Sequence, residues 1–208
     1  NYFIKKTTIS KIDYKICIIS SVVPQIDRIF FTLLKIHNFK TFNININKIK
    51  KDIFFRYISR QLGADRIANT CGAIKKYGKN LIIIDFGTAT TFDVIIKKNY
   101  LGGIIAPGVK LSLETLTTKA SLIPPIKLKT VKNVLGKNTY TAVRSGFYWG
   151  YLGLIENIIN KISKQTKKKY KIVFTGGFSH FFKKGVFKKV SIDRDITIKG
   201  LLKVCKLI

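Results

Sequence analysis

Two apolar runs in this sequence open directly into glycine and threonine. Residues 81–93 are LIIIDFGTATTFD, and residues 171–177 are KIVFTGG. Glycine lets the backbone approach an anion closely, and threonine hydroxyls and free backbone N–H groups donate hydrogen bonds to phosphate. A tight turn after a buried strand explains TGG equally well, but such a turn does not require the three threonines of DFGTATT. The first stretch therefore predicts a phosphate-binding loop.

The carboxylate of Asp85 lies at the end of the first apolar run. It would repel a bound phosphate unless a cation lay between the two negative groups. Asp85 therefore predicts a cation beside the phosphate.

A second acidic residue lies beside an arginine. In the stretch LGADRIAN (62–69), Asp65 and Arg66 follow Gly63. One interpretation is a helix N-terminus, where the helix dipole favours an acidic residue. The other is a base next to an anion clamp, because a carboxylate can deprotonate a hydroxyl and an arginine can hold a carboxylate through two parallel hydrogen bonds. The residues alone leave both interpretations open.

Two common phosphate motifs are absent from the sequence. The stretch GGIIAPGVKLS has Gly103 and Gly108 at the spacing of a Walker A loop, but Val109 stands where that loop has its lysine. No GxGxxG occurs, so a Rossmann dinucleotide site is not supported.

The composition fits one large domain or two smaller lobes, since the 208 residues are 46% hydrophobic. No apolar run reaches 18 residues, so no membrane span is expected.

The three cysteines form no CxxC pair and the two histidines lie far apart. This pattern argues against a disulfide framework or a zinc site and fits a reducing cytoplasm. There is no signal peptide at the start and no methionine anywhere, so we expect the sequence to be a fragment.

The formal net charge of +29 raises the question of a nucleic-acid partner. Of the 39 basic residues, 33 are lysines spread along the whole chain, and isoleucine and asparagine are also abundant. All three residue types have A/T-rich codons, so a biased genome explains the charge. Aromatic residues interleaved on a sheet face, or a recognisable module, would be needed for nucleic-acid binding, and neither is seen. Nucleic acid is therefore not expected as a partner.

Strand-like and helix-like segments alternate along the chain, which predicts an α/β fold. Period-2 and period-3.6 patterns distinguish the two types. Strands are predicted at 14–23, 41–46, 80–87 and 170–178, a hairpin followed by a loop at 90–108, helices at 25–37, 52–77 (interrupted near Gly63), 109–118, 138–163 and from 179, and a strand or helix at 195–205.

Eight stretches, in this order, resemble type III pantothenate kinase over nearly the whole chain. Among them GADR, DFGTATTFD and the GGIIAPG pattern are quite specific, whereas FTGG alone is not. The stretches are ISSVVP (19–24), GADR (63–66), DFGTATTFD (85–93), YLGGIIAPGV (100–109), LGKNT (135–139), SGFYWGYLGLIE (145–156), FTGG (174–177) and ITIKGL (196–201).

The resemblance implies the fold of the acetate kinase, sugar kinase, Hsp70 and actin superfamily. Two RNase H-like lobes then enclose a nucleotide cleft, and we place the first lobe in residues 1–79 and the second in residues 80–208. The family's first strand carries a DxGNT motif that helps to bind Mg²⁺ and ATP phosphates. That motif is absent here, so the first lobe is expected to be incomplete at its N-terminus.

The resemblance also implies a function. The protein would be a cytoplasmic homodimer that transfers phosphate from ATP to pantothenate, the first step of coenzyme A biosynthesis. It would require Mg²⁺ and a monovalent cation, K⁺ or NH₄⁺. The alternative is a catalytically degenerate relative that acts as a regulatory protein or binds nucleic acid or another partner. The absent DxGNT motif favours the alternative, and the retained GADR and DFGTATTFD stretches favour the kinase.

The site residues implied by the resemblance have four roles. Asp65 would be the base that takes the proton of the pantothenate hydroxyl, and Asp85 would hold the monovalent cation. Tyr57 stands one place out of register with a family tyrosine, and the Asn-Pro pair expected before GADR is missing. The remaining assignments are Gly63, Ala64, Arg66, Tyr57 and Thr139 for pantothenate, with Thr139 from the partner subunit, and Gly87, Thr88, Gly176 and Gly177 for ATP.

Overall fold

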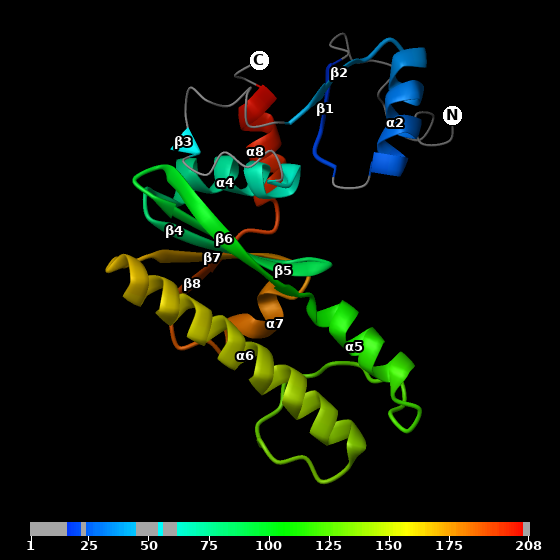
Figure 1. The fold of residues 1–208 in the computed structure, drawn as a ribbon, viewed down its shortest axis with the longest axis vertical. Helices are drawn as coiled ribbons and strands as arrows, with labels where there is room; N and C mark the ends of the chain where they lie inside the picture. Colours follow the sequence, from blue (N-terminus) through cyan, green and yellow to red (C-terminus); the bar gives the residue numbers. More distant parts are fainter. Residues whose placement is uncertain (1–15, 22–23, 45–53, 56–61, 206–208) are drawn as a thin grey trace.

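The computed structural model describes residues 16–21, 24–44, 54–55 and 62–205 (Figure 1). Its centre is a six-stranded sheet with the strand order β3-β6-β5-β4-β7-β8. The strands β4, β5 and β6 form an antiparallel meander, and β7 and β8 continue the sheet parallel to β4. Three antiparallel strands followed by two parallel ones is the RNase H-like order. The strands are β3 (Phe54–Phe55), β4 (Leu81–Phe86), β5 (Ala89–Ile96), β6 (Asn99–Pro107), β7 (Lys171–Gly176) and β8 (Val190–Ile192).

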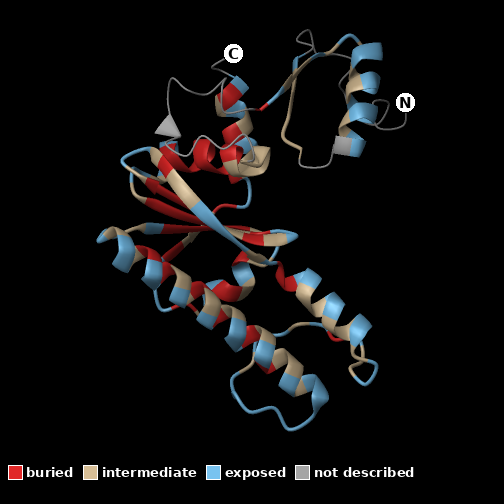
Figure 2. Ribbon diagram, in the orientation of Figure 1, coloured by how far each residue is buried: buried red, intermediate tan, exposed pale blue. Residues whose placement is uncertain are grey.

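Helices cover both faces of this sheet. On one face lie α4 (Ala64–Tyr77) and α8 (Ile196–Cys205), and on the other lie α6 (Thr139–Thr166) and the short α7 (Ser179–Lys183). The central strand β4 is buried on both sides, which explains its uninterrupted apolar run from Leu81 to Ile84. Figure 2 shows the buried residues concentrated in the sheet and on the helix faces turned toward it.

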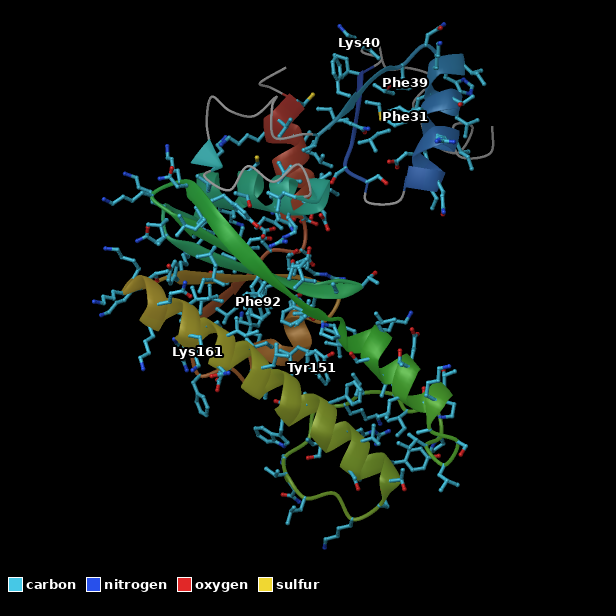
Figure 3. All side chains as sticks on the ribbon, in the orientation of Figure 1. Phe31, Phe39, Lys40, Phe92, Tyr151 and Lys161 are labelled. Atoms are coloured by element: carbon cyan, nitrogen blue, oxygen red, sulfur yellow. The ribbon has the colours of Figure 1, made fainter. Side chains whose placement is uncertain are left out.

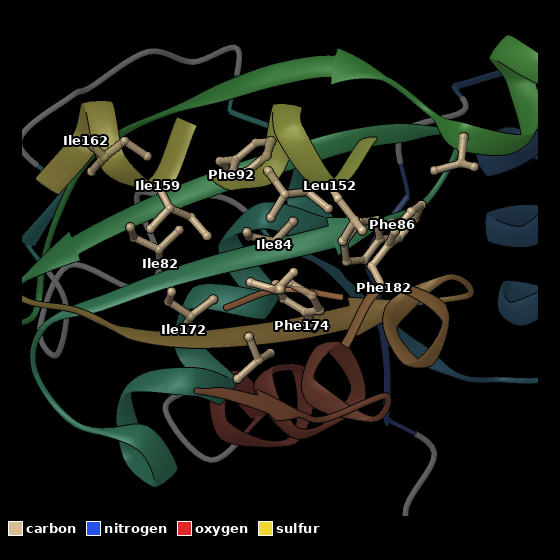
Figure 4. Close-up of a cluster of buried hydrophobic side chains, with 14 of the residues drawn as sticks. Ile82, Ile84, Phe86, Phe92, Leu152, Ile159, Ile162, Ile172, Phe174 and Phe182 are labelled. Carbon is tan, nitrogen blue, oxygen red and sulfur yellow. The ribbon is translucent and has the colours of Figure 1, made fainter. Parts of the chain in front are cut away.

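Two hydrophobic cores result, one on each side of the sheet. Ile83 and Ile95 face α4 and α8, whereas Ile82, Ile84 and Phe92 face α6 and α7. Figure 4 shows the second core, where Leu152 and Ile159 of α6 and Phe182 of α7 pack over the strands. The period-2 alternation of side chains along β4 and β5 therefore separates the two cores.

The N-terminal part is a small β-α-β unit made of β1 (Ile16–Ile19), α2 (Pro24–Ile36) and β2 (Lys40–Asn43). The two strands pair in parallel, with Ile16 opposite Lys40. Phe31 of α2 and Phe39, directly before β2, lie on the side of the helix that faces these strands (Figure 3). Ile44, directly after β2, is buried in the core under α4 and α8, so this unit is connected to the sheet domain by packing.

Most predicted elements are present, and the α/β class is confirmed. One prediction was wrong: residues 54–55 form strand β3, which pairs with Asn99 and Tyr100 of β6, rather than part of a helix. Strand β6 also continues through the segment predicted as a loop, to Pro107. The ambiguous segment 195–205 is the helix α8, and β8 was not predicted.

The helix α4 packs closely on α8. A Cβ atom on Gly72 would overlap the carbonyl oxygen of Ile196, and one on Gly200 would overlap that of Ala68. The two glycines therefore let the helix backbones touch. The proposed lobe boundary between residues 79 and 80 stays a prediction. Among the described residues, no helix combines the length and apolar character needed to cross a bilayer.

Candidate active site

The N-terminus of α4 lies over one end of the sheet, where polar side chains replace the core. Asp85 of β4 is in register with Thr91 of β5 and Thr175 of β7. Because side chains alternate along a strand, Asp85 points to the same face as Ile83, toward α4. Asp93, two residues after Thr91, shares this face. The sheet therefore presents a row of carboxylates and hydroxyls to the start of α4.

The first turn of α4 presents Asp65. The helix begins at Ala64 after Gly63, which provides no side-chain cap. Asp65 Oδ1 instead accepts a hydrogen bond from the backbone N–H of Arg66 at 2.8 Å. A carboxylate is favoured there by the unpaired N–H groups and the dipole of the helix. Asp65 also lies close enough to raise the pKa of both Asp85 and Asp93.

The carboxylate of Asp85 is held by a chain of hydrogen bonds from two helices. Asn69 of α4 donates from Nδ2 to Asp85 Oδ2 at 2.8 Å, and Thr197 of α8 donates to Asn69 Oδ1 at 2.6 Å. Burial raises the pKa of Asp85, the Asn69 hydrogen bond opposes that rise, and Asp65 adds to it. In the described part of the chain, Asp85 has no ion pair with lysine or arginine. A half-buried carboxylate whose pKa is raised by desolvation and whose only side-chain donor is neutral fits a cation site.

Two glycine turns lie side by side at this end of the sheet. The N–H of Gly87 donates to the carbonyl of Ala89, and the N–H of Gly177 donates to the carbonyl of Phe86, both at 3.1 Å. Gly176 has a φ of 80°, and a Cβ there would lie 2.6 Å from Asp85 Oδ1. Glycine is therefore required where β7 passes the Asp85 carboxylate.

The helix α5 (Val109–Lys119) begins against the first of these turns. A Cβ on Gly108 would overlap the carbonyl oxygen of Thr88, so glycine allows the two segments to touch. Gly87 and Thr88 are exposed at this junction. A helix N-terminus beside an exposed Gly-Thr turn is an arrangement suited to binding phosphate. The structure thus supplies an anion site next to a cation site.

Arg66 forms an ion pair with a buried carboxylate. Its Nε and Nη2 atoms lie 2.8 and 2.7 Å from Asp93 Oδ1, and Tyr100 donates from its hydroxyl to the same oxygen at 2.8 Å. Burial raises the pKa of Asp93 to about 6, although the charge of Arg66 and the hydrogen bonds from Arg66 and Tyr100 act to lower it. Asp93 is therefore ionised at neutral pH and fixes the guanidinium in place.

The structure brings most of the predicted site residues together. Gly63, Ala64, Asp65 and Arg66 open α4 above Asp85, and the ATP-loop residues Gly87, Thr88, Gly176 and Gly177 form the adjacent turns. Thr139 is exposed at the start of α6, at the end of that helix far from the sheet (Figure 1). Tyr57 lies outside the described residues.

Three residues of the site were missed by the sequence analysis: Asn69, Asp93 and Thr197. Asn69 follows GADR by one helical turn, and Asp93 ends the stretch DFGTATTFD. Both residues therefore lie in or beside motifs that the sequence analysis had already identified. Thr197 lies 128 positions from Asn69, so its role required the folded structure.

The fold and the site together define a class. An RNase H-like sheet with two glycine turns and a half-buried carboxylate at the ends of its central strands is suited to phosphoryl transfer from a nucleotide. Residues 2–161 match the profile of the type III pantothenate kinase family. The chain therefore belongs to that family.

Individual relatives carry the same family name. The chain is 52% identical to the type III pantothenate kinase of Pelagibacter ubique over 198 residues, which cover 92% of this chain and 77% of the relative. It is 38% identical to that of Paracoccus denitrificans over 194 residues, 89% of this chain and 73% of the relative. A crystal structure from Campylobacter jejuni, described as a Baf family transcriptional activator, is 24% identical with a TM-score of 0.53. That match covers 84% of this chain and 87% of the other and concerns the fold alone.

Proposed function

We propose that the protein phosphorylates pantothenate with ATP, the first step of coenzyme A biosynthesis. The hydroxyl oxygen of pantothenate attacks the γ-phosphorus of ATP, the bond from that phosphorus to the β,γ-bridging oxygen breaks, and ADP leaves. The observation that carries the proposal is the position of Asp65 and Arg66, at the helix end above the glycine turns and Asp85.

Asp65 is the proposed general base. Its side chain is only half-buried, and it has no ion pair in the described part of the chain. It can therefore accept a hydrogen bond from the substrate hydroxyl and then its proton as phosphate is transferred. Phosphoryl transfer depends mainly on positioning and charge neutralisation, so one well-placed carboxylate suffices on the acceptor side.

Arg66, with Gly63 and Ala64, is the proposed pantothenate site. Pantothenate carries a carboxylate, and a guanidinium binds a carboxylate through charge-assisted hydrogen bonds. Nε and Nη2 are directed to Asp93, which leaves Nη1 for the substrate. We place Tyr57 on the same substrate, in line with the family resemblance.

The two glycine turns and the start of α5 form the proposed ATP phosphate site. Gly87, Thr88, Gly176 and Gly177 offer close backbone approach, and the α5 N-terminus adds a favourable dipole. Asp85 is the proposed ligand of K⁺ or NH₄⁺, since its half-buried charge has no cationic side chain as a partner among the described residues. A cation there would neutralise charge beside the phosphates.

Mg²⁺ accompanies ATP in kinase reactions. It commonly retains several waters and binds substrate phosphates with one or two protein carboxylates. The described residues contain no cluster of three or more His, Cys, Asp or Glu side chains placed for a metal ion. Mg²⁺ bound to the ATP phosphates would supply charge neutralisation beside the two glycine turns.

A homodimer in the cytoplasm completes the proposal. Thr139 lies far from Asp65 within the chain, so its proposed contact with pantothenate would come from the partner subunit. A degenerate, regulatory relative is the less favoured alternative, because Asp65 and both glycine turns are present and lie at the same end of the sheet.

The test is product formation. Purified protein is incubated with ATP, Mg²⁺, K⁺ and pantothenate, and 4′-phosphopantothenate and ADP are measured by mass spectrometry. Omitting pantothenate provides the control for ATP hydrolysis. Equal amounts of both products, dependent on pantothenate, are expected. ADP without phosphopantothenate would argue for a different acceptor.

A further inference from the structure

The two oxygens of the Asp93 carboxylate have unequal surroundings. Oδ1 is within 2.8 Å of Arg66 Nε, Arg66 Nη2 and the Tyr100 hydroxyl. Oδ2 is buried and has no hydrogen-bond partner among the described residues. Leaving a buried carboxylate oxygen unpaired costs free energy. The site thus tolerates one unpaired oxygen while three donors converge on the other.

The guanidinium of Arg66 is confined on its other side by the β6 backbone. A Cβ on Gly103 would overlap Arg66 Nη2 and the carbonyl oxygen of Phe92. The side chain of Arg66 is only 12% exposed, and that of Asp93 is fully buried. The absence of a side chain at position 103 therefore leaves room for the Arg66 guanidinium in the position where Asp93 holds it.

We propose that Asp93 is a positioning residue that sets the preference of the site for a substrate bearing a carboxylate. It holds Arg66 by Nε and Nη2, so that Nη1, which has no hydrogen bond within the described part of the chain, is presented to the substrate. This inference rests on the proposed function, in which Arg66 binds the carboxylate of pantothenate. Fixing an arginine before binding reduces the rotamer freedom that the substrate would otherwise have to restrict.

The substitution Asp93→Asn tests this role, since it keeps the size of the side chain and removes its charge. We expect KM for pantothenate to rise on the order of ten- to a hundredfold, as for a misplaced binding group. KM for ATP should change little. The informative readout is the preference for pantothenate over pantothenol, in which a hydroxymethyl group replaces the carboxylate. That preference, measured as a ratio of kcat/KM values or of inhibition constants, should fall by the same factor.

Tyr100→Phe is the matched control. It removes one donor from the same Asp93 oxygen but leaves the Arg66–Asp93 ion pair. We expect lower thermal stability with the pantothenate preference retained. An equal loss of preference in both variants would assign Asp93 a merely structural role and overturn the proposal, as would an Asp93→Asn protein that keeps the wild-type preference.

Gly103→Ala provides a second route if Asp93→Asn does not fold. Position 103 is exposed, and the added methyl group would displace Arg66 and the Phe92 carbonyl without removing the Asp93 charge. The same loss of preference is expected, and a retained preference would overturn the proposal. A wild-type protein that does not phosphorylate pantothenate would instead contradict the proposed function, so the two failures are distinguishable.

Discussion

The carboxylates of Asp85 and Asp93 lie on adjacent strands, the first half-buried and the second fully buried, and they differ in their partners. Asp93 has an arginine and a tyrosine, whereas Asp85 has only the amide of Asn69. A buried charge is normally paired or coordinates a metal ion. The contrast supports an ion pair at Asp93 that holds Arg66 in place, and a cation site at Asp85.

Asp85→Ala should weaken ATP binding and abolish activation by K⁺ together, because the same cation neutralises the carboxylate and the phosphates. We expect an increase in KM for ATP of about tenfold or more, comparable to the loss of one electrostatic contact. Initial rates measured across a K⁺ titration at several ATP concentrations test this prediction. An unchanged K⁺ dependence would place the cation elsewhere.

The free energy of unfolding should depend on pH because Asp93 titrates at a different pH in the folded and unfolded protein. Its pKa is raised from 3.8 to about 6 by burial, so its folded form binds a proton more readily than its unfolded form. The resulting contribution to stability is fully present below about pH 4 and is lost as pH rises through about 6. The stability of wild type relative to Asp93→Asn should therefore decrease over this window, by up to about 3 kcal/mol, and stay constant above it.

Denaturant unfolding of both proteins at pH values from 4 to 8 measures this difference, and other titrating groups cancel between the two. A relative stability that increases with pH would mean that Arg66 lowers the pKa of Asp93 below its ordinary value.

At the scale of elements, the packing of α4 against α8 holds the side chains around Asp85 in position. Thr197 of α8 orients Asn69 of α4, which in turn orients Asp85. At the C-terminal end of α4, Asp193 accepts hydrogen bonds from Lys76 and Tyr77 of that helix and from Lys199 of α8. The two helices therefore act as one unit over the sheet.

Gly200→Ala should separate these helices, because its Cβ would overlap the Ala68 carbonyl oxygen. We expect a loss of about 1–3 kcal/mol in the free energy of unfolding, typical of overpacking. Gly153→Ala in α6 is the control: its Cβ meets nothing within 4 Å, so stability should be unchanged or higher by up to about 1 kcal/mol. Thermal unfolding of the two variants makes the comparison, and equal stability would contradict close packing of α4 on α8.

Local patterns predicted the elements that bury a regular apolar face. Examples are the uninterrupted apolar run of β4 and the apolar pattern of period 3.6 that continues along α6. Strand β3 was mistaken for helix because its two residues gain their strand character only by pairing with β6, and β8 has just three residues. Segment 195–205 was ambiguous because its apolar residues fit either period, and packing on α4 decides for a helix.

In the candidate site, too, residues within short motifs were predicted from the sequence, whereas contacts between distant segments were not. Asp85 and the first glycine turn were predicted from the chemistry of their own short stretch, whereas the role of Asp65 was implied only by the family resemblance. The partnership of Arg66 with Asp93 spans 27 positions and depends on the β5–β6 hairpin. Contacts of this kind arise from strand register, which single-sequence patterns do not specify.

At the scale of the whole molecule, α5 and the first half of α6 extend away from the sheet (Figure 1). Exposed apolar residues gather there, including Leu122 at 90% and Leu135 at 86% exposure. Large exposed apolar areas are typical of interaction surfaces. This arm carries Thr139, so a dimer formed through it could deliver that residue to a neighbouring site.

Mixing two inactive variants tests this arrangement. If each site combines Asp65 of one subunit with Thr139 of the other, a heterodimer of Asp65→Asn and Thr139→Ala contains one intact site. An equal mixture that exchanges subunits freely should then recover about a quarter of the wild-type activity. If both residues come from the same subunit, no intact site forms and no activity returns. Gel filtration checks that both variants are dimers.

The most direct test of the account compares wild type and Asp65→Asn in phosphopantothenate formation and ATP binding. We predict that turnover falls by at least about a hundredfold, as for loss of a general base, while the dissociation constant for ATP stays within about twofold. That result would place Asp65 on the acceptor side of the reaction. Turnover like that of wild type in Asp65→Asn would contradict the proposed site.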